Sequence, residues 1–170
     1  MLSSLTINCV VKVFMMRQIL IDTCVLVRER ATRDPAHSLA VSAIEQLIER
    51  GWEPCVVPQC LIEFWSVATR PIDARGGLGL SLDDAQAAID EFIATHRLLM
   101  EPPDIFARWY TLVRDHAVQG RQVWDARLVA CMEAHSINYL LTFNIADFQR
   151  YTSVHALHPE DVPQILEPLE

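Results

Sequence analysis

The stretch that decides the fold is Arg17-Gln18-Ile19-Leu20-Ile21-Asp22-Thr23. Its three consecutive apolar residues are typical of a short strand that is buried on both faces of a parallel sheet. Asp22 follows as the first polar residue after the run. An acid at this position is either a turn or cap residue or part of a functional site, and the rest of the sequence has to distinguish the two.

Further strands and helices alternate along the chain. Strands are expected at residues 54–58, 97–101, 137–141 and 154–157. Helices are expected at residues 35–50, 59–70, 81–96, 103–119, 123–135 and 146–150. Helical spacing of apolar residues, a capping box that begins at Ser81, and Gly51 and Gly120 at helix ends support these assignments. Short apolar strands between helices predict an α/β fold with a parallel sheet.

Length and composition suit one compact domain. The chain has 170 residues, of which 51% are hydrophobic and 21% charged, so it is neither disordered nor fibrous. The 14 Lys and Arg residues against 22 Asp and Glu residues give a net charge of -8. This balance argues against tight nucleic-acid binding by a general basic surface, but not against an enzyme that contacts phosphate through bound metal ions.

The domain is expected at residues 17–158. Residues 1–16 would be a poorly structured N-terminal extension, with Met15 or Met16 as the native start, and residues 159–170 a Pro- and Glu-rich tail on the surface. A signal peptide is the alternative interpretation of the apolar part of the extension.

Cysteine content and hydropathy bear on location. No apolar run approaches the ~20 residues that span a bilayer, so no membrane association is expected. The cysteines are odd in number and include no C-x-x-C pair, which argues against a disulfide framework or structural zinc and favours the reducing cytoplasm. They are Cys9, Cys24, Cys55, Cys60 and Cys131.

Four acids occupy positions of interest for chemistry. Asp22 and Asp147 follow predicted strands, so both would emerge at the carboxyl edge of the sheet, where ligands of parallel α/β folds collect. Glu63 is the only charge near the start of an apolar helix. Asp125 shares a helical stripe with apolar residues three, four and seven positions later, which is the spacing of a buried face.

A buried carboxylate needs a cation, which either an arginine such as Arg70 or Arg127 or a metal ion would supply. Two like charges ~4 Å apart repel by roughly 4 kcal/mol at an effective dielectric of ~20, so a cluster of acids is suited to divalent ions. Oxygen ligands select Mg²⁺ or Mn²⁺ rather than zinc. Such an ion activates water and neutralises a leaving oxygen, as in metal-dependent nucleases.

Four segments in this order carry a family resemblance. They are Ile19-Leu20-Ile21-Asp22-Thr23, Leu61-Ile62-Glu63-Phe64, Val123-Trp124-Asp125-Ala126-Arg127-Leu128 and Thr142-Phe143-Asn144-Ile145-Ala146-Asp147-Phe148. Together they resemble the PIN domain, and more narrowly the VapC-type ribonuclease toxins of toxin–antitoxin pairs, over about residues 17–157. The resemblance implies a three-layer PIN-like fold, in which helices flank a central parallel sheet and the acids meet in one groove.

The resemblance also implies an activity and partners. The protein would be a Mg²⁺-dependent or Mn²⁺-dependent endoribonuclease that hydrolyses RNA phosphodiester bonds, as the toxin of a type II toxin–antitoxin system. Its partners would be the RNA substrate, a VapB-type antitoxin that blocks the groove, and a second copy in a homodimer.

Seven residues take roles by this resemblance. Asp22 and Asp125 would be the principal metal ligands. Glu63 would complete the acidic cluster or orient water, and Asp147 would assist directly or through water. Hydrogen bonds to these carboxylates would come from the neutral residues Thr23, Thr142 and Asn144.

Two residues depart from the family pattern. Cys24 stands where Asn or Ser is common, which puts one hydrogen bond to a metal ligand in doubt. Trp124 stands where His is frequent, and it is expected in the core together with Trp65 and Trp109.

Each acid also has a structural interpretation. Asp22 would cap a turn or helix, Asp125 would pair with an arginine, Glu63 would pair with Arg70, and Asp147 would cap the short helix around it. These alternatives require no metal and no chemistry.

Two further functions remain open for the whole chain. A phosphoacceptor receiver domain would need a lysine after its last strand, but the single lysine, Lys12, precedes the first. A PIN-like module that binds RNA or protein without cutting is the other alternative. Near the predicted groove, Arg28, Arg30 and Arg33 would either contact RNA or lie in a solvated loop.

Overall fold

The computed structural model describes residues 17–164, so the extension expected at residues 1–16 lies outside the described part of the chain. Its strands are β1 (Arg17–Ile21), β2 (Trp52–Val56), β3 (Arg97–Leu98), β4 (Tyr139–Leu141) and β5 (His155–Leu157). Its α-helices are α1 (Thr23–Arg30), α2 (His37–Glu49), α3 (Pro58–Ala68), α4 (Leu82–Thr95), α5 (Ile105–Asp115), α6 (Gln122–Ala134) and α7 (Ile145–Phe148). A 3₁₀ helix, η1, spans Pro159–Gln164.

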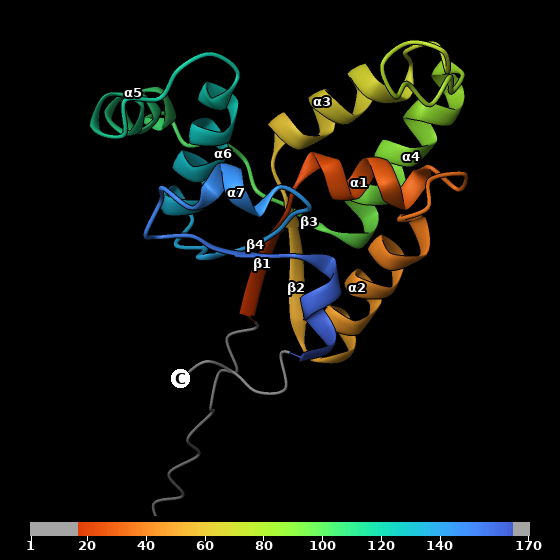
Figure 1. Cartoon of the computed structure of the whole chain (residues 1–170), viewed down its shortest axis with the longest axis horizontal. Coiled ribbons are helices and arrows are strands. Elements are labelled where there is room, and N and C mark those ends of the chain that lie inside the picture. The colour runs from red at the N-terminus through yellow and green to blue at the C-terminus, as the bar shows by residue number, and fades with distance from the viewer. Residues whose placement is uncertain (1–16, 165–170) are drawn as a thin grey trace, which may run out of the picture.

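The strands form one parallel sheet in the order β3-β2-β1-β4-β5. Helices α5, α6 and α7 lie on one side of it and α1 to α4 on the other (Figure 1). The predicted α/β fold, with a central parallel sheet flanked by helices, is confirmed.

β1 forms the centre of both the sheet and the core. Ile19, Leu20 and Ile21 are at most 1% exposed, because β2 and β4 pair with β1 on its two edges and helices cover its two faces. The apolar run that opens the domain is therefore buried on all sides, as its composition predicted.

The strand order reverses beside β1. The chain builds β2 and β3 outward on one side of β1, then returns to add β4 and β5 on the other. Such a switch point leaves a crevice at the carboxyl ends of the strands. Asp22 follows β1 here, and its backbone N–H donates to the carbonyl of Leu141 at the end of β4 over 3.0 Å. The topology thus brings the residues after β1 and after β4 together.

Helix α1 was not predicted, and the solvated loop proposed for Arg28 and Arg30 is wrong. Its eight residues carry no strong amphipathic pattern, but Val25 and Leu26 are fully buried. Tertiary packing of these two side chains therefore stabilises a helix that local spacing does not signal. Arg33 follows the helix and is exposed.

Several element boundaries differ from the prediction. β2 begins at Trp52 rather than at Pro54, so Pro54 lies inside the strand. The strand tolerates this proline because β3 pairs only with Cys55 and Val56, so the N–H that Pro54 lacks is not needed for that pairing. The strand expected at residues 97–101 has two residues, and it precedes prolines that cannot donate to a sheet.

The C-terminal segment packs more closely than a surface tail would. η1 lies against α2, Val162 is fully buried, and Arg50 donates a hydrogen bond to the Val162 carbonyl. Packing therefore continues at least to Val162, beyond the expected boundary at residue 158.

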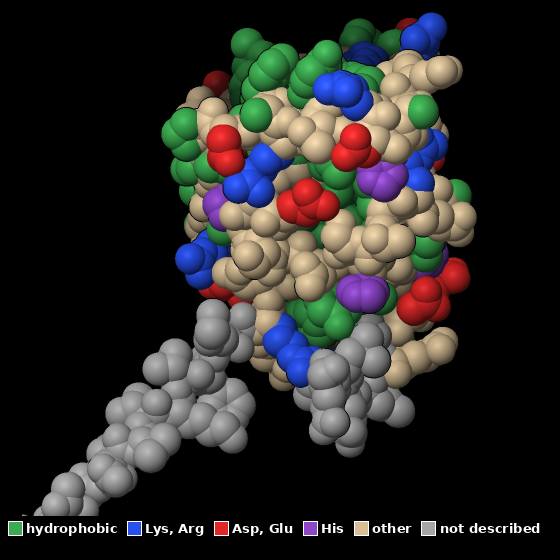
Figure 2. Space-filling model, turned by 90° about the vertical axis from the view of Figure 1, so that its left-hand side faces the viewer, with side chains coloured by type: hydrophobic (Ala, Val, Ile, Leu, Met, Phe, Trp, Pro, Cys, Tyr) green, Lys and Arg blue, Asp and Glu red, His purple; other side chains and the backbone are tan. Residues whose placement is uncertain are grey.

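The surface of the described residues carries charges of both signs, and their cysteines are free thiols. On the side of α5, α6 and α7, acidic and basic side chains stand interspersed among neutral ones (Figure 2). None of the helices within residues 17–164 has the length and hydropathy to cross a membrane. The cysteines of this part of the chain are unbridged; they are Cys24, Cys55, Cys60 and Cys131.

Candidate active site

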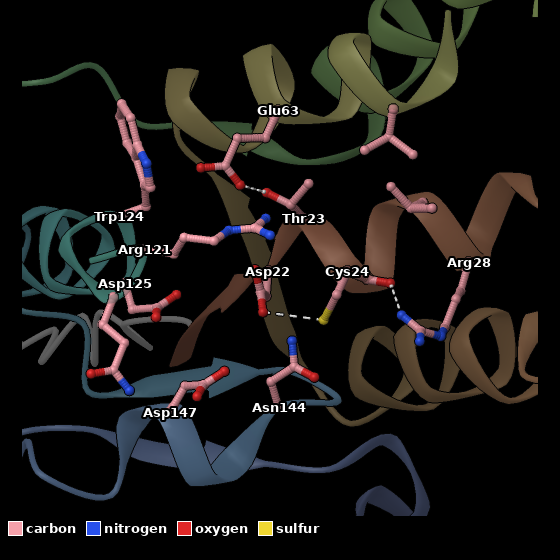
Figure 3. A pocket seen from close by; sticks show the side chains of 13 residues that line it. Asp22, Thr23, Cys24, Arg28, Glu63, Arg121, Trp124, Asp125, Asn144 and Asp147 are labelled. Carbon is pink, nitrogen blue, oxygen red and sulfur yellow. Dashed lines mark hydrogen bonds between the residues drawn. The ribbon is translucent and has the colours of Figure 1, made fainter. Parts of the chain in front are cut away.

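A cavity of about 480 Å³ opens at the carboxyl ends of β1 and β4 (Figure 3). Its walls come from the β1–α1 junction, α3, the start of α6 and the segment that leads into α7. All four predicted acids line it, namely Asp22, Glu63, Asp125 and Asp147. Side chains far apart in the sequence therefore share one polar cavity at the switch point of the sheet.

Asp22 is the N-cap residue of α1, but its side chain makes no capping hydrogen bond. Its backbone is extended, with φ -69° and ψ 150°, as is usual at an N-cap. Asp22 thus occupies the N-cap position, as the capping interpretation holds, but its carboxylate does not cap the helix and faces the cavity instead.

Two donors hold the Asp22 carboxylate. Thr142 Oγ1 donates to Oδ2 over 2.6 Å, and Cys24 Sγ donates to the same oxygen over 3.1 Å. Burial, followed by the charge of Asp22, raises the pKa of the Cys24 thiol to about 12, so it stays protonated and remains a donor. Cys24 therefore supplies the hydrogen bond that its departure from the family pattern had put in doubt.

Glu63 is held through both of its oxygens. Thr23 Oγ1 donates to Oε2 over 3.0 Å, and Gln59 Nε2 donates to Oε1 over 2.9 Å. The alternative interpretation, in which Glu63 pairs with Arg70, is wrong, because the Arg70 guanidinium instead donates to the Arg75 carbonyl.

Gln59 is a buried residue of this site that the sequence analysis missed. Its Oε1 accepts from Arg127 Nη1 over 3.0 Å, which assigns Nε2 as the end that donates to Glu63 and to the Trp124 carbonyl. Its position four residues before Glu63 on α3 is the available signal, because side chains at i and i+4 meet on a helix.

Asp125 faces the cavity without an arginine partner. Within residues 17–164 no ion pair shorter than 4.0 Å involves it; Arg127 pairs with Glu101 instead, so the structural interpretation is wrong. Burial raises the pKa of Asp125 from 3.8 to about 7, and the charges of Asp147, Asp22 and Glu63 contribute after it. The remaining acids of the cavity are therefore close enough to disfavour a negative charge there.

Asp147 and Asn144 occupy the segment around α7. Asp147 lies inside α7 and does not cap it, since the N-cap residue is Asn144. The Asn144 side chain lines the cavity, but none of its hydrogen bonds within the described residues reaches a carboxylate; its backbone N–H donates to Thr142 Oγ1 over 3.0 Å. The expected hydrogen bond from Asn144 to an acid is absent from this structure.

The cavity also contains residues that the sequence analysis misjudged. Trp124 is 56% exposed at the cavity wall, so its prediction as a core residue is wrong; Trp65 and Trp109 are half-buried against the core. Arg121 lines the cavity and was not predicted. Its place four residues before Asp125 is a signal that helical spacing provides.

The donor set fits a hydrated divalent ion better than a closed cage. Among residues 17–164, no three Asp, Glu, His or Cys side chains stand close enough to enclose a metal ion. Mg²⁺ commonly keeps several waters and binds one or two carboxylates directly, so acids spread around one cavity suit it. The raised pKa of Asp125 is the second indication, because a bound cation would favour the charged carboxylate that burial and the neighbouring acids disfavour.

Comparison with known families decides the classification. The model of the PIN domain family matches residues 19–153. The chain belongs to the PIN domain family. Membership excludes the receiver-domain interpretation, which the sheet also contradicts: receiver domains of the CheY type have the order 2-1-3-4-5, whereas this sheet has 3-2-1-4-5.

Solved structures of similar fold include toxin–antitoxin proteins at low sequence identity. VapBC2 from Rickettsia felis, bound to a DNA fragment from its promoter, matches with a TM-score of 0.61 and 13% identity, over 83% of this chain and 98% of that one. A toxin–antitoxin complex from Klebsiella pneumoniae matches with a TM-score of 0.57 and 18% identity, over 83% of this chain and 97% of that one.

A third structure is described by its cleavage target. It is VapC20 from Mycobacterium tuberculosis, a toxin that cleaves the sarcin–ricin loop, with a TM-score of 0.52 and 17% identity over 72% of this chain and 86% of that one. At these identities the likeness establishes the PIN fold. No curated protein sequence matches the chain.

Proposed function

We propose that this PIN domain is a metal-dependent endoribonuclease that hydrolyses RNA phosphodiester bonds, as the VapC-type toxin of a type II toxin–antitoxin system. The observation that carries the proposal is the set of four acids in one cavity with no arginine paired to any of them within residues 17–164. An acidic cavity of this kind repels RNA unless divalent cations occupy it.

Asp22 and Asp125 are the proposed metal ligands. A bound Mg²⁺ or Mn²⁺ would supply an activated water and neutralise charge at the RNA phosphate. Asp22 faces the cavity with an oriented carboxylate, and Asp125 has the carboxyl group whose charge most needs a cation. Glu63 and Asp147 would hold water or complete the coordination from the other walls of the cavity.

Neutral residues keep the acids in place before metal and RNA arrive. Thr142 and Cys24 orient Asp22, while Thr23 and Gln59 orient Glu63. Each carboxylate oxygen has two lone pairs, so these donors orient the acids and still leave lone pairs for a ligand, which is the usual support of a metal site.

We also propose a VapB-type antitoxin as partner. A shallow apolar hollow of about 260 Å³ between α3 and α4 supports a protein contact; it is lined by Leu61, Ile62, Trp65 and Ile89. Ile62 is 69% exposed there, although it is a large apolar residue. The homodimer and the cytoplasmic location stay predictions, and light scattering of the purified protein tests the first.

A PIN-like module that binds RNA or protein without cutting is the second candidate. The observation in its favour is that the acids within residues 17–164 do not form a closed metal cage. It predicts RNA binding that is insensitive to divalent metal and to Asp125→Asn.

The deciding experiment is an RNA cleavage assay with total bacterial RNA. We expect the wild-type protein to produce discrete fragments with Mg²⁺ or Mn²⁺, and neither the chelated protein nor Asp125→Asn to do so. RNA binding without fragments under every metal condition would favour the module that does not cut.

A further inference from the structure

The start of α6 presents two side chains to the cavity that neither the core nor the acidic cluster uses. We propose that Trp124 and Arg121 form a binding site for one unpaired nucleotide of an RNA substrate, in which the Trp124 indole stacks on the base and the Arg121 guanidinium contacts a phosphate. The inference rests on the proposed function and adds to it a requirement for an unpaired base next to the acidic cluster.

Trp124 and Arg121 are arranged to act on one ligand. They are three residues apart at the beginning of α6, so their side chains leave the helix on the same side. Both line the cavity that contains Asp22 and Asp125, and the Arg121 side chain extends from α6 into it (Figure 3). A nucleotide held by this pair would therefore lie beside the proposed metal ligands.

Trp124 is exposed although its helix is well packed. Ala126, Leu128 and Val129, which follow on α6, are at most 3% exposed, whereas Trp124 is 56% exposed. The Trp124 indole therefore lies at the polar cavity and contributes little to the packing of the core. Aromatic side chains in such positions are stacking surfaces for unpaired bases.

The backbone beneath the Trp124 ring is fixed from two other helices. Gln59 Nε2, on α3, donates to the Trp124 carbonyl over 3.0 Å. Trp109 Nε1, on α5, donates to the Val123 carbonyl over 2.8 Å. A surface held in this way loses little conformational entropy when a base stacks on it, which favours binding.

Arg121 is available to an anion. Arg121 is an exposed residue, and among residues 17–164 its side chain forms no ion pair with a carboxylate within 4.0 Å, even though acids line the same cavity. By contrast, the Arg150 guanidinium donates a hydrogen bond to Gln122 Oε1 over 2.7 Å. A guanidinium without a carboxylate partner can donate two parallel hydrogen bonds to the oxygens of a phosphate.

The charge of the molecule favours a local contact of this kind. The net charge is -8, and charges of both signs are mixed on the face in Figure 2, so a broad basic surface does not explain how RNA would bind. Stacking is independent of net charge, and only an unpaired base exposes its whole face to an indole. The expected substrate is therefore a loop or single strand rather than a duplex.

The test measures RNA affinity in an Asp22→Asn background, which the proposed function makes unable to cut. The probes are an oligouridine and an oligoadenosine of about eight nucleotides, and an RNA duplex of the same length, in Mg²⁺. We expect Trp124→Ala to weaken binding of the single strands about tenfold or more, Trp124→Phe to stay within about threefold, and the duplex to bind weakly throughout. Tyr110→Ala is the matched control, because Tyr110 is 51% exposed on α5 and does not line the cavity.

Two further measurements separate stacking from a structural effect. Stacking on Trp124 should quench tryptophan fluorescence when oligouridine binds, and Trp124→Phe should remove that quenching. Arg121→Ala should flatten the dependence of log K on log salt concentration by about 0.7, the value for one phosphate contact on a single strand, whereas Arg121→Lys should keep the slope.

The inference would be overturned if Trp124→Ala bound the single strands as tightly as its Asp22→Asn parent. It would also be overturned if the Asp22→Asn parent bound the duplex as tightly as the single strands. Loss of antitoxin binding by Trp124→Ala, with RNA affinity unchanged, would overturn it in favour of a protein contact. The proposed function fails separately, if the wild-type protein binds the single strands with quenching but cuts no RNA with any metal.

Discussion

Two carboxylates at helix α6 lie in opposite environments. Glu101 Oε2 lies 2.6 Å from Nη2 of Arg127, in a pair that is largely shielded from solvent. Asp125 lies on α6 itself, two residues before Arg127, and has no arginine within 4.0 Å among residues 17–164. Residues two apart on a helix point to different sides, so Arg127 serves Glu101 and not Asp125.

The difference shows which carboxylates stabilise the fold. The Glu101–Arg127 pair is a local structural contact that also orients Gln59. Asp125 gains no such partner, and burial together with three neighbouring acids raises its pKa to about 7. A group kept at an electrostatic disadvantage inside a cavity is a candidate for function, because stability alone would favour a paired or apolar residue there.

The largest expected effect separates the two carboxylates by activity. Asp125→Asn, and likewise Asp22→Asn, should lower RNA cleavage at least about a hundredfold, because each removes a proposed ligand of the ion that stabilises the transition state. Glu101→Gln should keep cleavage within about tenfold, since Glu101 does not line the cavity. Initial rates at saturating metal measure both, and equal losses for Asp125→Asn and Glu101→Gln would contradict the distinction.

The pH dependence of stability is the next largest effect. The pKa of Asp125 is about 7 in the folded protein and near 3.8 in the unfolded chain, so the folded state binds this proton more tightly. The resulting stabilisation is fully present below pH about 4 and is lost as the pH rises to about 7; with solvent screening it amounts to at most about 2 kcal/mol.

Urea unfolding of the metal-free protein at several pH values measures this contribution. Asp125→Asn should remove it, so the difference in unfolding free energy between wild type and variant should change across the window from pH about 4 to about 7. A constant difference across that window would show that the Asp125 carboxyl does not titrate as described.

A smaller effect is expected at the paired carboxylate. Glu101→Gln should destabilise the metal-free protein by about 1 kcal/mol, because Arg127 loses its ionic partner in a partly buried position. Asp125→Asn should leave the melting temperature unchanged or higher, since it removes a carboxylate whose charge is disfavoured by burial and by the neighbouring acids. Thermal unfolding without metal compares them, and marked destabilisation by Asp125→Asn would assign that carboxylate a structural role.

The smallest effect concerns the thiol that holds Asp22. Cys24→Ala removes the donor 3.1 Å from Asp22 Oδ2, while Thr142 still donates, so we expect cleavage to fall about threefold to tenfold. Cys24→Ser restores a donor and should remain near wild type. A matching loss in the serine variant would mean that packing of the sulfur, rather than its hydrogen bond, is what matters.

The central sheet and the shared position of Asp22 and Asp147 at its carboxyl edge could be predicted from local signals, because apolar strands precede both acids and parallel topology brings strand ends to one edge. Glu63 and Asp125 lie within helices, so their place in the same cavity was implied by the resemblance to the PIN domain and not by a local pattern. Helix α1 could not be predicted because its stability comes from burial of Val25 and Leu26 by distant elements.

The finer contacts of the site depended on tertiary arrangement. Whether Arg127 would pair with Asp125 or turn away was open in the sequence, since both lie on one helix and Glu101 comes from another segment. Trp124 was expected in the core because aromatic residues usually are, and only the orientation of α6 places its ring at the cavity.

The most direct measurement for the shared metal site is a calorimetric titration of Mn²⁺ into the metal-free wild type and into Asp125→Asn. The titration is done at pH about 6, where the Asp125 carboxyl is largely protonated before the metal binds. We expect wild type to bind Mn²⁺ and release a proton, seen as a heat that varies with the ionisation enthalpy of the buffer, and Asp125→Asn to bind much more weakly without that release. Absence of binding at millimolar Mn²⁺, or equal binding by both proteins, would contradict the proposal that these acids hold a divalent cation together.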